Sequence, residues 1–508
     1  MEDTTRNIEP TPHYKSKKRF SQTFKRIFFI EKLYNTTGFI LLSILAVLVA
    51  VGTAYAGIVF GVLLIMGIVA LPLLYAIIAY PKFGIIVLLI MSYMLFVLTQ
   101  FGLDGPIGTI MDVLQVLLVF GMFIQLKKDK NWVIFKSPIT WVSLLWLGYN
   151  LIELFNPHSG SSMAWLYTVR PVAITTLTYF VFMYSINSVK YIRLIFKIWL
   201  VLTCIGAAYA FKQEYIGFSA HEQAYLAMPG IADLLLIDGH WRKFSIFSDP
   251  VAFAYNMVMP SIFCICMLTL NIKLWKKIVF GCLIGFFLDA MLFSGTRGAN
   301  VLIPAALGLF VVLKFNRRIL FATILAAIFL AFLITVPTSN PNLYRFQTAF
   351  KPNNDDSYNL RKRNQKRIQP YIVSHIMGGG LGSTGEWGER FTPESYLAHF
   401  PPDSGYMRVA VEDGWAGLLV FCFFMFVIIK TGINNYYLIK DKELKTYCLA
   451  MTLIIFAYNL ANFPQEALVQ FPSNILFYME AALINITLRL DVAQKQQRDK
   501  VMLTTNII

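Results

Sequence analysis

The chain has 508 residues, of which 57% are hydrophobic and only 14% are charged, and its formal net charge is +16. A soluble globular domain carries many more charged residues, so this composition excludes one and indicates a polytopic membrane protein. The positive charge does not call for a nucleic-acid partner, because membrane orientation accounts for it.

Apolar segments near the 20 residues that cross a bilayer recur along the chain. They predict an all-α fold with about fourteen transmembrane helices. The expected spans are 38–57, 59–79, 83–101, 107–126, 138–155, 170–187, 193–212, 251–271, 277–293, 299–314, 319–336, 406–429, 446–462 and 472–488.

The basic segments set the orientation and the domain boundaries. Residues 1–37 and 489–508 are expected to be cytoplasmic tails, because cytoplasmic loops and ends collect Lys and Arg. Between them lie helices 1–11 (38–336, including an outside loop at 213–250), a large extracytoplasmic loop (337–405) and helices 12–14 (406–488). The sequence therefore predicts a multi-pass protein of the cytoplasmic membrane with both termini inside.

The large loop is expected to be mostly helical. The segment "LRKRNQKRIQPYIVSHIM" predicts an amphipathic helix interrupted near Pro370, and "GGGLGSTG" at 378–385 ends it. This glycine run contains a formal GxGxxG, but no strand of a βαβ unit precedes it, so a dinucleotide site is rejected. A turn, or a nest of amides for an oxyanion, remains open.

Three charged motifs fall at the same predicted outer face of the membrane. They are "GHWRKFSIFSDPVAFAYN" (239–256), "FSGTRGAN" (293–300) and "PPDSGYMRVAVEDG" (401–414). Charges beside hydrocarbon are costly unless they face a polar cavity. The agreement in sidedness therefore indicates a functional site at this face.

Four arginines are the candidate anion-binding residues. Arg297 is expected to begin a helix, where exposed amides and a guanidinium suit phosphate oxygens, although it could simply snorkel to the interface. Arg242 precedes Asp249-Pro250, which resembles a helix cap followed by proline. Arg361 belongs to a basic run that could equally be a solvated helix face. Arg408 is discussed below with Glu412.

The last motif offers a proton acceptor. Asp403 or Ser404 could cap the following helix, or Asp403, with His399 close by, could accept a proton at the membrane surface. Arg408 and Glu412 are spaced i, i+4 and can pair on one helix face. Glu412 could hold Arg408 for an anion or merely neutralise it. No metal site and no cofactor are expected, because His and Cys residues are unclustered.

These motifs resemble the O-antigen ligase and polymerase superfamily of bacterial membrane glycosyltransferases. The likeness covers about 239–430 and rests on "WRKFSIFSDPVAFAYN", on "LFSGTRGANVLIPAALGLF" and on the loop ending "HFPPDSGYMRVAVEDGWAGLLVF". It implies an enzyme of surface polysaccharide biosynthesis in the bacterial inner membrane. Its donor would be a polyprenyl-diphosphate-linked glycan, and its acceptor a glycan or lipid.

The resemblance also implies roles for residues. Arg242, Arg297 and Arg361 would contact the diphosphate, and no metal would be required. Asp403 stands where the ligases carry a histidine, and polymerase-like members are similar to this chain in having an acidic residue there. This departure favours polymerisation over ligation.

Two other classes of function remain open. A transporter or flippase for a lipid-linked or anionic solute would place paired charges near the bilayer midplane, whereas the charges here gather at the rim. A non-catalytic assembly or sensor protein would use the outside loop to bind a partner.

Overall fold

The computed structural model describes residues 34–100, 107–228, 230–237, 239–339, 341–350 and 356–505, and it is mostly helical. The chain divides into two compact units, residues 1–76 and 77–508. The helices are α2 (Thr36–Ala79), α3 (Pro81–Gln100), α4 (Ile107–Asp129), η2 (Trp132–Phe135), α5 (Pro138–Ile152), η3 (Glu153–Phe155), α6 (Ser162–Ser185), α7 (Val189–Tyr215), α8 (Ala220–Leu226), α9 (Ile231–Leu235), α10 (Pro250–Leu268), α11 (Leu274–Phe293), α12 (Arg297–Leu313), α13 (Arg317–Thr335), α14 (Pro341–Thr348), α15 (Asp356–Ser374), α16 (Gly385–Phe391), α17 (Gly405–Glu412), α18 (Gly414–Leu438), α19 (Lys442–Ala461) and α20 (Ser473–Thr505).

Nine helices in the described part of the chain are long and apolar enough to cross a membrane. They contain Thr36–Tyr55, Pro81–Leu98, Gly108–Asp129, Ser162–Ser185, Val189–Tyr215, Pro250–Leu268, Arg317–Thr335, Gly414–Leu438 and Lys442–Ala461. The protein is therefore a multi-pass membrane protein.

The count of nine is smaller than the fourteen expected, and the other five segments show why. Residues 38–57 and 59–79 form one continuous helix, α2, and α5 and α12 have only 15 and 17 residues. The expected spans at 277–293 and 472–488 lie in α11 and α20, which carry charged side chains such as Asp289 and Glu480. These five segments are helical, as predicted, but they are not shown to be separate membrane spans.

The core of residues 77–508 is built around α10 and α19. Of their spanning windows, 83% and 78% of residues are buried, against none for α13. α10 packs on α11, α12 and α19, and α20 packs on α6 and α19. The buried helices fix the positions of the charged motifs at their ends, because their own packing leaves little freedom.

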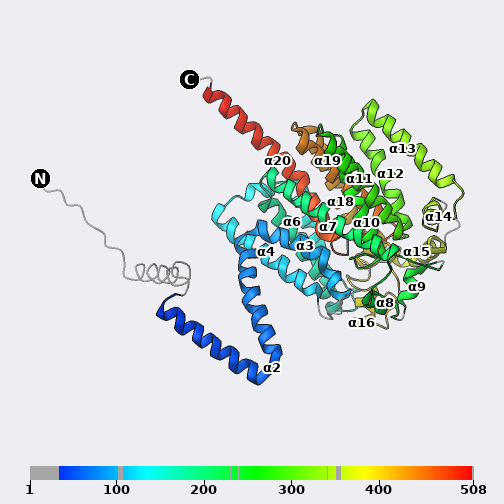
Figure 1. The fold of residues 1–508 in the computed structure, drawn as a ribbon. Coiled ribbons are helices and arrows are strands. Elements are labelled where there is room, and N and C mark those ends of the chain that lie inside the picture. The colour runs from blue at the N-terminus through cyan, green and yellow to red at the C-terminus, as the bar shows by residue number, and fades with distance from the viewer. Residues whose placement is uncertain are drawn as a thin grey trace. The chain divides into compact units, whose positions relative to one another are not determined.

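Short elements gather at one end of this helix bundle (Figure 1). β1 (Leu236–Ile237) and β2 (His240–Trp241) form a small antiparallel pair in which Leu236 faces Trp241. α8, α9, α14, α15 and α16 lie at the same end. α15 runs without a break to Ser374 and includes Pro370, so the expected interruption there was wrong. Only one backbone hydrogen bond is lost at a proline, and a helix held by its neighbours can continue past it.

Candidate functional site

Arg242 joins the first two charged motifs. It follows β2, its Nε donates to the Ser294 carbonyl oxygen at 2.8 Å, and its Nη2 donates to Thr296 Oγ1 at 3.0 Å. Thr296 in turn donates to the Pro250 carbonyl oxygen at 3.1 Å. These bonds hold the start of α10 against the turn in front of Arg297, where α12 begins as expected.

Four arginines come close together around this junction. Burial, and next the charge of Arg345, lower the pKa of Arg242 to about 10, and Arg297 and Arg361 act in the same direction. Asp249 opposes them. The guanidinium remains protonated at neutral pH. We call Arg242, Arg297, Arg345 and Arg361 the arginine cluster.

Arg345, on α14, is the member that the sequence did not indicate. Its side chain is only 9% exposed. It packs over Gly295, where an added Cβ would lie 3.0 Å from Arg345 Nη1. Gly295 also has a φ of +59°, so a glycine is needed for both the turn and the close approach. The stretch "NLYRFQTAF" carries no motif that would have singled out this arginine.

Two aspartates share a cavity next to the cluster. Asp249 and Asp403 both line a cavity of about 230 Å³, together with Tyr255, Glu466, Gln470 and Ser473. Asp249 caps α10 as predicted, accepting from the amides of Val251 at 2.7 Å and Ala252 at 2.9 Å. One of the two aspartates, Asp249, is thus committed to a helix end.

Asp403 is not used as a cap. Ser404 takes that role in α17, and its Oγ accepts from the Met407 amide at 3.4 Å. The half-buried Asp403 accepts from Asn364 Nδ2 at 3.4 Å, and it lines a second, small pocket with Arg361. The capping alternative for Asp403 is therefore wrong, and its carboxylate lies beside a member of the arginine cluster.

His399 lies apart from this arrangement. The side chain is exposed, and its Nε2 lies 2.9 Å from the Pro393 carbonyl oxygen. It lines neither of the two pockets that contain Asp403. The structure therefore brings Asp403 close to an arginine and turns His399 toward the surface.

Arg408 lies between two carboxylates. Its Nε is 3.2 Å from Glu412 Oε1, as the i, i+4 spacing predicts, and its Nη1 is 2.9 Å from Glu466 Oε2. Burial raises the pKa of Glu466 above its usual range, while the Arg408 charge acts against this shift. Glu466, in the loop before α20, was not anticipated from the sequence. The charge of Arg408 is therefore compensated within this group.

Glu412 also fastens the glycine-rich turn. It is 1% exposed, and its carboxylate accepts from the Gly382 amide at 3.0 Å, the Thr384 amide at 3.4 Å and the Thr384 hydroxyl. The turn at 378–385 is thus a nest of amides for an oxyanion, and the oxyanion is the chain's own Glu412. We call Arg408, Glu412, Glu466 and residues 378–385 the carboxylate clamp.

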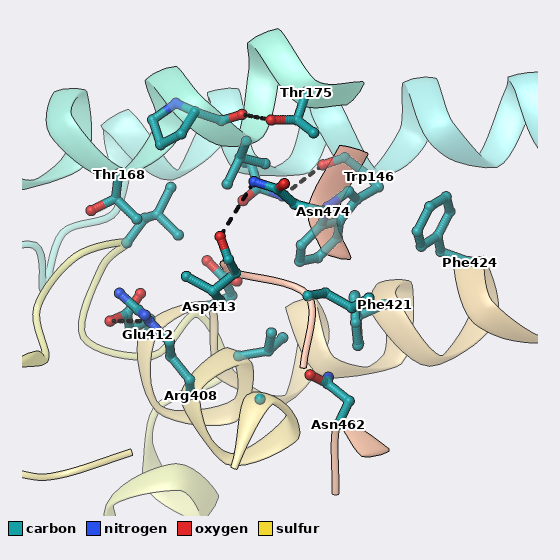
Figure 2. Close-up of a pocket in the computed structure, with 18 of the residues that line it drawn as sticks. Trp146, Thr168, Thr175, Arg408, Glu412, Asp413, Phe421, Phe424, Asn462 and Asn474 are labelled. Carbon is teal, nitrogen blue, oxygen red and sulfur yellow. Dashed lines mark hydrogen bonds and ion pairs between the residues drawn. The ribbon is translucent and has the colours of Figure 1, made fainter. Parts of the chain in front are cut away.

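Arg408 and Glu412 also line a second cavity. Its volume is about 240 Å³, and its walls are mostly apolar. Figure 2 shows Arg408 and Glu412 paired on one side of this cavity and the aromatic rings of Trp146, Phe421 and Phe424 on the opposite side. Such a cavity suits an apolar chain close to a polar group.

Within the described ranges, no group of three His, Cys, Asp or Glu side chains comes together in a way that could hold a metal ion. The arrangement instead offers concentrated guanidinium groups next to a carboxylate. Positive charge of this kind binds phosphate oxygens, and a carboxylate can accept a proton.

Comparison with known proteins agrees with this chemistry. Residues 280–422 match the family model described as O-antigen ligase, and the match lies inside the 239–430 stretch that carried the resemblance. It includes Arg297, Arg345, Arg361 and Asp403, whereas Arg242 lies outside it. None of the curated proteins matches the chain.

Proposed function

Because residues 280–422 of this membrane protein form an O-antigen ligase domain, we propose that it is a glycosyltransferase that uses a polyprenyl-diphosphate-linked glycan. The observation that carries the proposal is the gathering of four arginines, one of which, Arg361, lines a pocket together with Asp403. Like charges repel, so a cluster of them is best suited to a multiply charged anion such as a diphosphate.

The proposed reaction transfers a glycan from the carrier to an acceptor sugar hydroxyl. The bond between the anomeric carbon and the diphosphate oxygen breaks, and a bond from that carbon to the acceptor oxygen forms. The electron pair of the broken bond goes to the leaving diphosphate. The arginine cluster stabilises the negative charge that develops there, which is the role a metal ion has in many enzymes.

The acceptor hydroxyl loses its proton as it attacks, and we assign that proton to Asp403. The assignment is supported by the position of Asp403 beside Arg361 and by the cap that Ser404 provides in its place. His399, with its ring at the surface, remains a second candidate for this step. The apolar cavity beside Arg408 suits part of the isoprenoid tail.

The proposed setting is the bacterial cytoplasmic membrane. We propose both termini in the cytoplasm, about fourteen spans, and a site that faces the periplasm or exterior, because the basic tails and short loops favour that orientation. Of the two reactions known in the superfamily, polymerisation is favoured by the carboxylate of Asp403 at the position where ligases carry histidine.

Replacement of Arg297 tests the proposal. Arg297→Ala is expected to slow consumption of lipid-linked glycan by roughly 10²–10³-fold, since one oxyanion-stabilising donor is lost. Arg297→Lys is expected to keep part of the activity, because lysine keeps the positive charge but cannot donate two parallel hydrogen bonds as a guanidinium does. Arg363→Ala, an exposed arginine on the same helix as Arg361, is the matched control.

Product analysis separates the alternatives. Repeat-unit chains still on the carrier identify a polymerase, and glycan moved to a lipid, protein or core acceptor identifies a ligase. Movement of intact glycolipid across the bilayer without a new glycosidic bond would identify a flippase. Equal glycan consumption by wild type, Arg297→Ala and Arg297→Lys would show that the catalytic proposal is wrong.

A further inference from the structure

A third cavity lies at the opposite end of the helix bundle from the clamp. Its volume is about 580 Å³, and it is lined by the ends of several helices. The two ends are connected by α6: Thr168 lines the cavity beside Arg408, and Ser185 lines this one. At about 1.5 Å per residue, these positions are about 25 Å apart along the helix. The third cavity is therefore a separate site.

Its position is that of a membrane–water interface. Three candidate spans begin or end here, at Pro81, Asp129 and Ser185. Tyr80 and Tyr184 also line the cavity, and tyrosine is enriched where spans meet the head-group region. A ligand in this cavity would lie at the depth of lipid head groups.

The charged lining consists of two cations and one carboxylate. Lys82 donates to Asn187 Oδ1 at 2.7 Å, and Asp129 accepts from the Tyr184 hydroxyl. Arg489 is half-buried and donates to the Met183 and Ile186 carbonyl oxygens, each at 2.8 Å, which places its guanidinium at the end of α6. One net positive charge remains, and a single phosphodiester would neutralise it.

A buried hydroxyl adds a second observation. Ser185 is 4% exposed, and within the described residues its Oγ has no hydrogen-bond partner although it lines the cavity. Buried polar atoms in native proteins nearly always have a partner. A phosphate oxygen in the cavity would accept a hydrogen bond from this hydroxyl.

From these observations we propose that this cavity binds the phosphodiester head group of an anionic membrane phospholipid, with Lys82 and Arg489 as the cationic contacts and Ser185 as a neutral donor. Basic pockets between transmembrane helices are suited to such head groups. The proposal does not rest on the glycosyltransferase assignment, because it uses neither the arginine cluster nor Asp403.

The test is a thermal-stability titration of the purified full chain in a neutral detergent. Short-chain phosphatidylglycerol is expected to raise the Tm saturably, whereas diacylglycerol with the same chains and inorganic phosphate are not. Lys82→Glu is expected to weaken the apparent affinity for phosphatidylglycerol at least tenfold. Lys190→Glu, an exposed lysine that does not line the cavity, should leave it unchanged.

A second pair of variants changes the volume of the cavity without changing its charge. Ala493→Phe places a ring at an exposed lining position and is expected to abolish the phosphatidylglycerol effect. Val492→Phe, at the neighbouring non-lining position, is expected to retain it. An equal Tm rise with diacylglycerol or with phosphate alone would overturn the assignment to a lipid head group, as would full retention of the effect in both Lys82→Glu and Ala493→Phe.

Discussion

Arg242 and Arg408 belong to neighbouring parts of the molecule but have opposite electrostatic surroundings. Arg408 contacts carboxylates on two sides, Glu412 at 3.2 Å and Glu466 at 2.9 Å. Arg242 hydrogen-bonds to neutral oxygens, and the charges of three further arginines act on it. In the carboxylate clamp the protein itself supplies the counter-charge of Arg408, whereas the arginine cluster concentrates charge of one sign.

We propose that this difference separates a structural use of Arg408 from an anion-binding use of the arginine cluster. A buried ion pair holds two chain segments in register, and removal of one of its partners leaves the other as an isolated buried charge. A group of like charges gains little stability by itself, but it binds an anion that arrives from outside. Substitutions in the carboxylate clamp should therefore lower folding stability, whereas substitutions in the arginine cluster should lower anion binding and turnover.

The largest effect is expected at the carboxylate beside the cluster. Asp403→Asn keeps the shape and removes the proton acceptor, so turnover should fall by roughly 10²–10⁴-fold while the Tm is retained. His399→Ala should retain most activity, because the imidazole faces Pro393. Turnover of lipid-linked glycan by the two purified variants measures this. A larger loss with His399→Ala would assign the proton step to the histidine.

Breaking the clamp should affect folding stability. Glu412→Ala removes the carboxylate that the Gly382 and Thr384 amides and Arg408 share, and it should lower the free energy of unfolding by about 3–5 kcal/mol. Thermal melts in detergent measure the loss, with the exposed Glu394→Ala as control. Unchanged stability together with lost activity would place Glu412 in the binding site instead.

The smallest expected effect is ligand-induced. Pyrophosphate at 100 times its Kd should stabilise the wild-type protein by about 2.7 kcal/mol, because it binds only the folded arginine cluster. Arg345→Gln should weaken that affinity roughly tenfold by removal of a charge-assisted hydrogen bond. A Tm titration measures both values, with Arg363→Gln as the matched control. Equal stabilisation of Arg345→Gln and wild type would show that Arg345 does not bind the anion.

The local features of the site could be predicted from the sequence, since they depend on neighbouring residues. The cap at Asp249, the helix start at Arg297 and the pairing of Arg408 with Glu412 each involve residues no more than four positions apart. Capping and i, i+4 spacing are short-range rules, and they held here. The choice between Asp403 and Ser404 as the cap was left open, because both side chains are competent.

The contacts between distant segments could not be predicted. The charge of Arg345 acts on Arg242 although the two residues are about a hundred positions apart in the chain, and Glu466 pairs with Arg408 from the loop before α20. Neither residue belongs to a motif. The number of spans is a related case: apolar composition marks a segment as membrane-embedded, but the length of each helix depends on where its neighbours let it end, and nine of the described helices are long and apolar enough to span.

The glycine-rich turn lies against the helix ends with no side chain between them. A Cβ on Gly378 would lie 2.3 Å from the Gly414 amide nitrogen, and one on Gly382 would lie 2.6 Å from the Ala164 carbonyl oxygen. Main-chain atoms thus set the distance between this turn and the starts of α6 and α18. Rotamer changes do not alter that distance, so Leu381, which the turn contributes to the wall of the apolar cavity beside Arg408, is held at a fixed position.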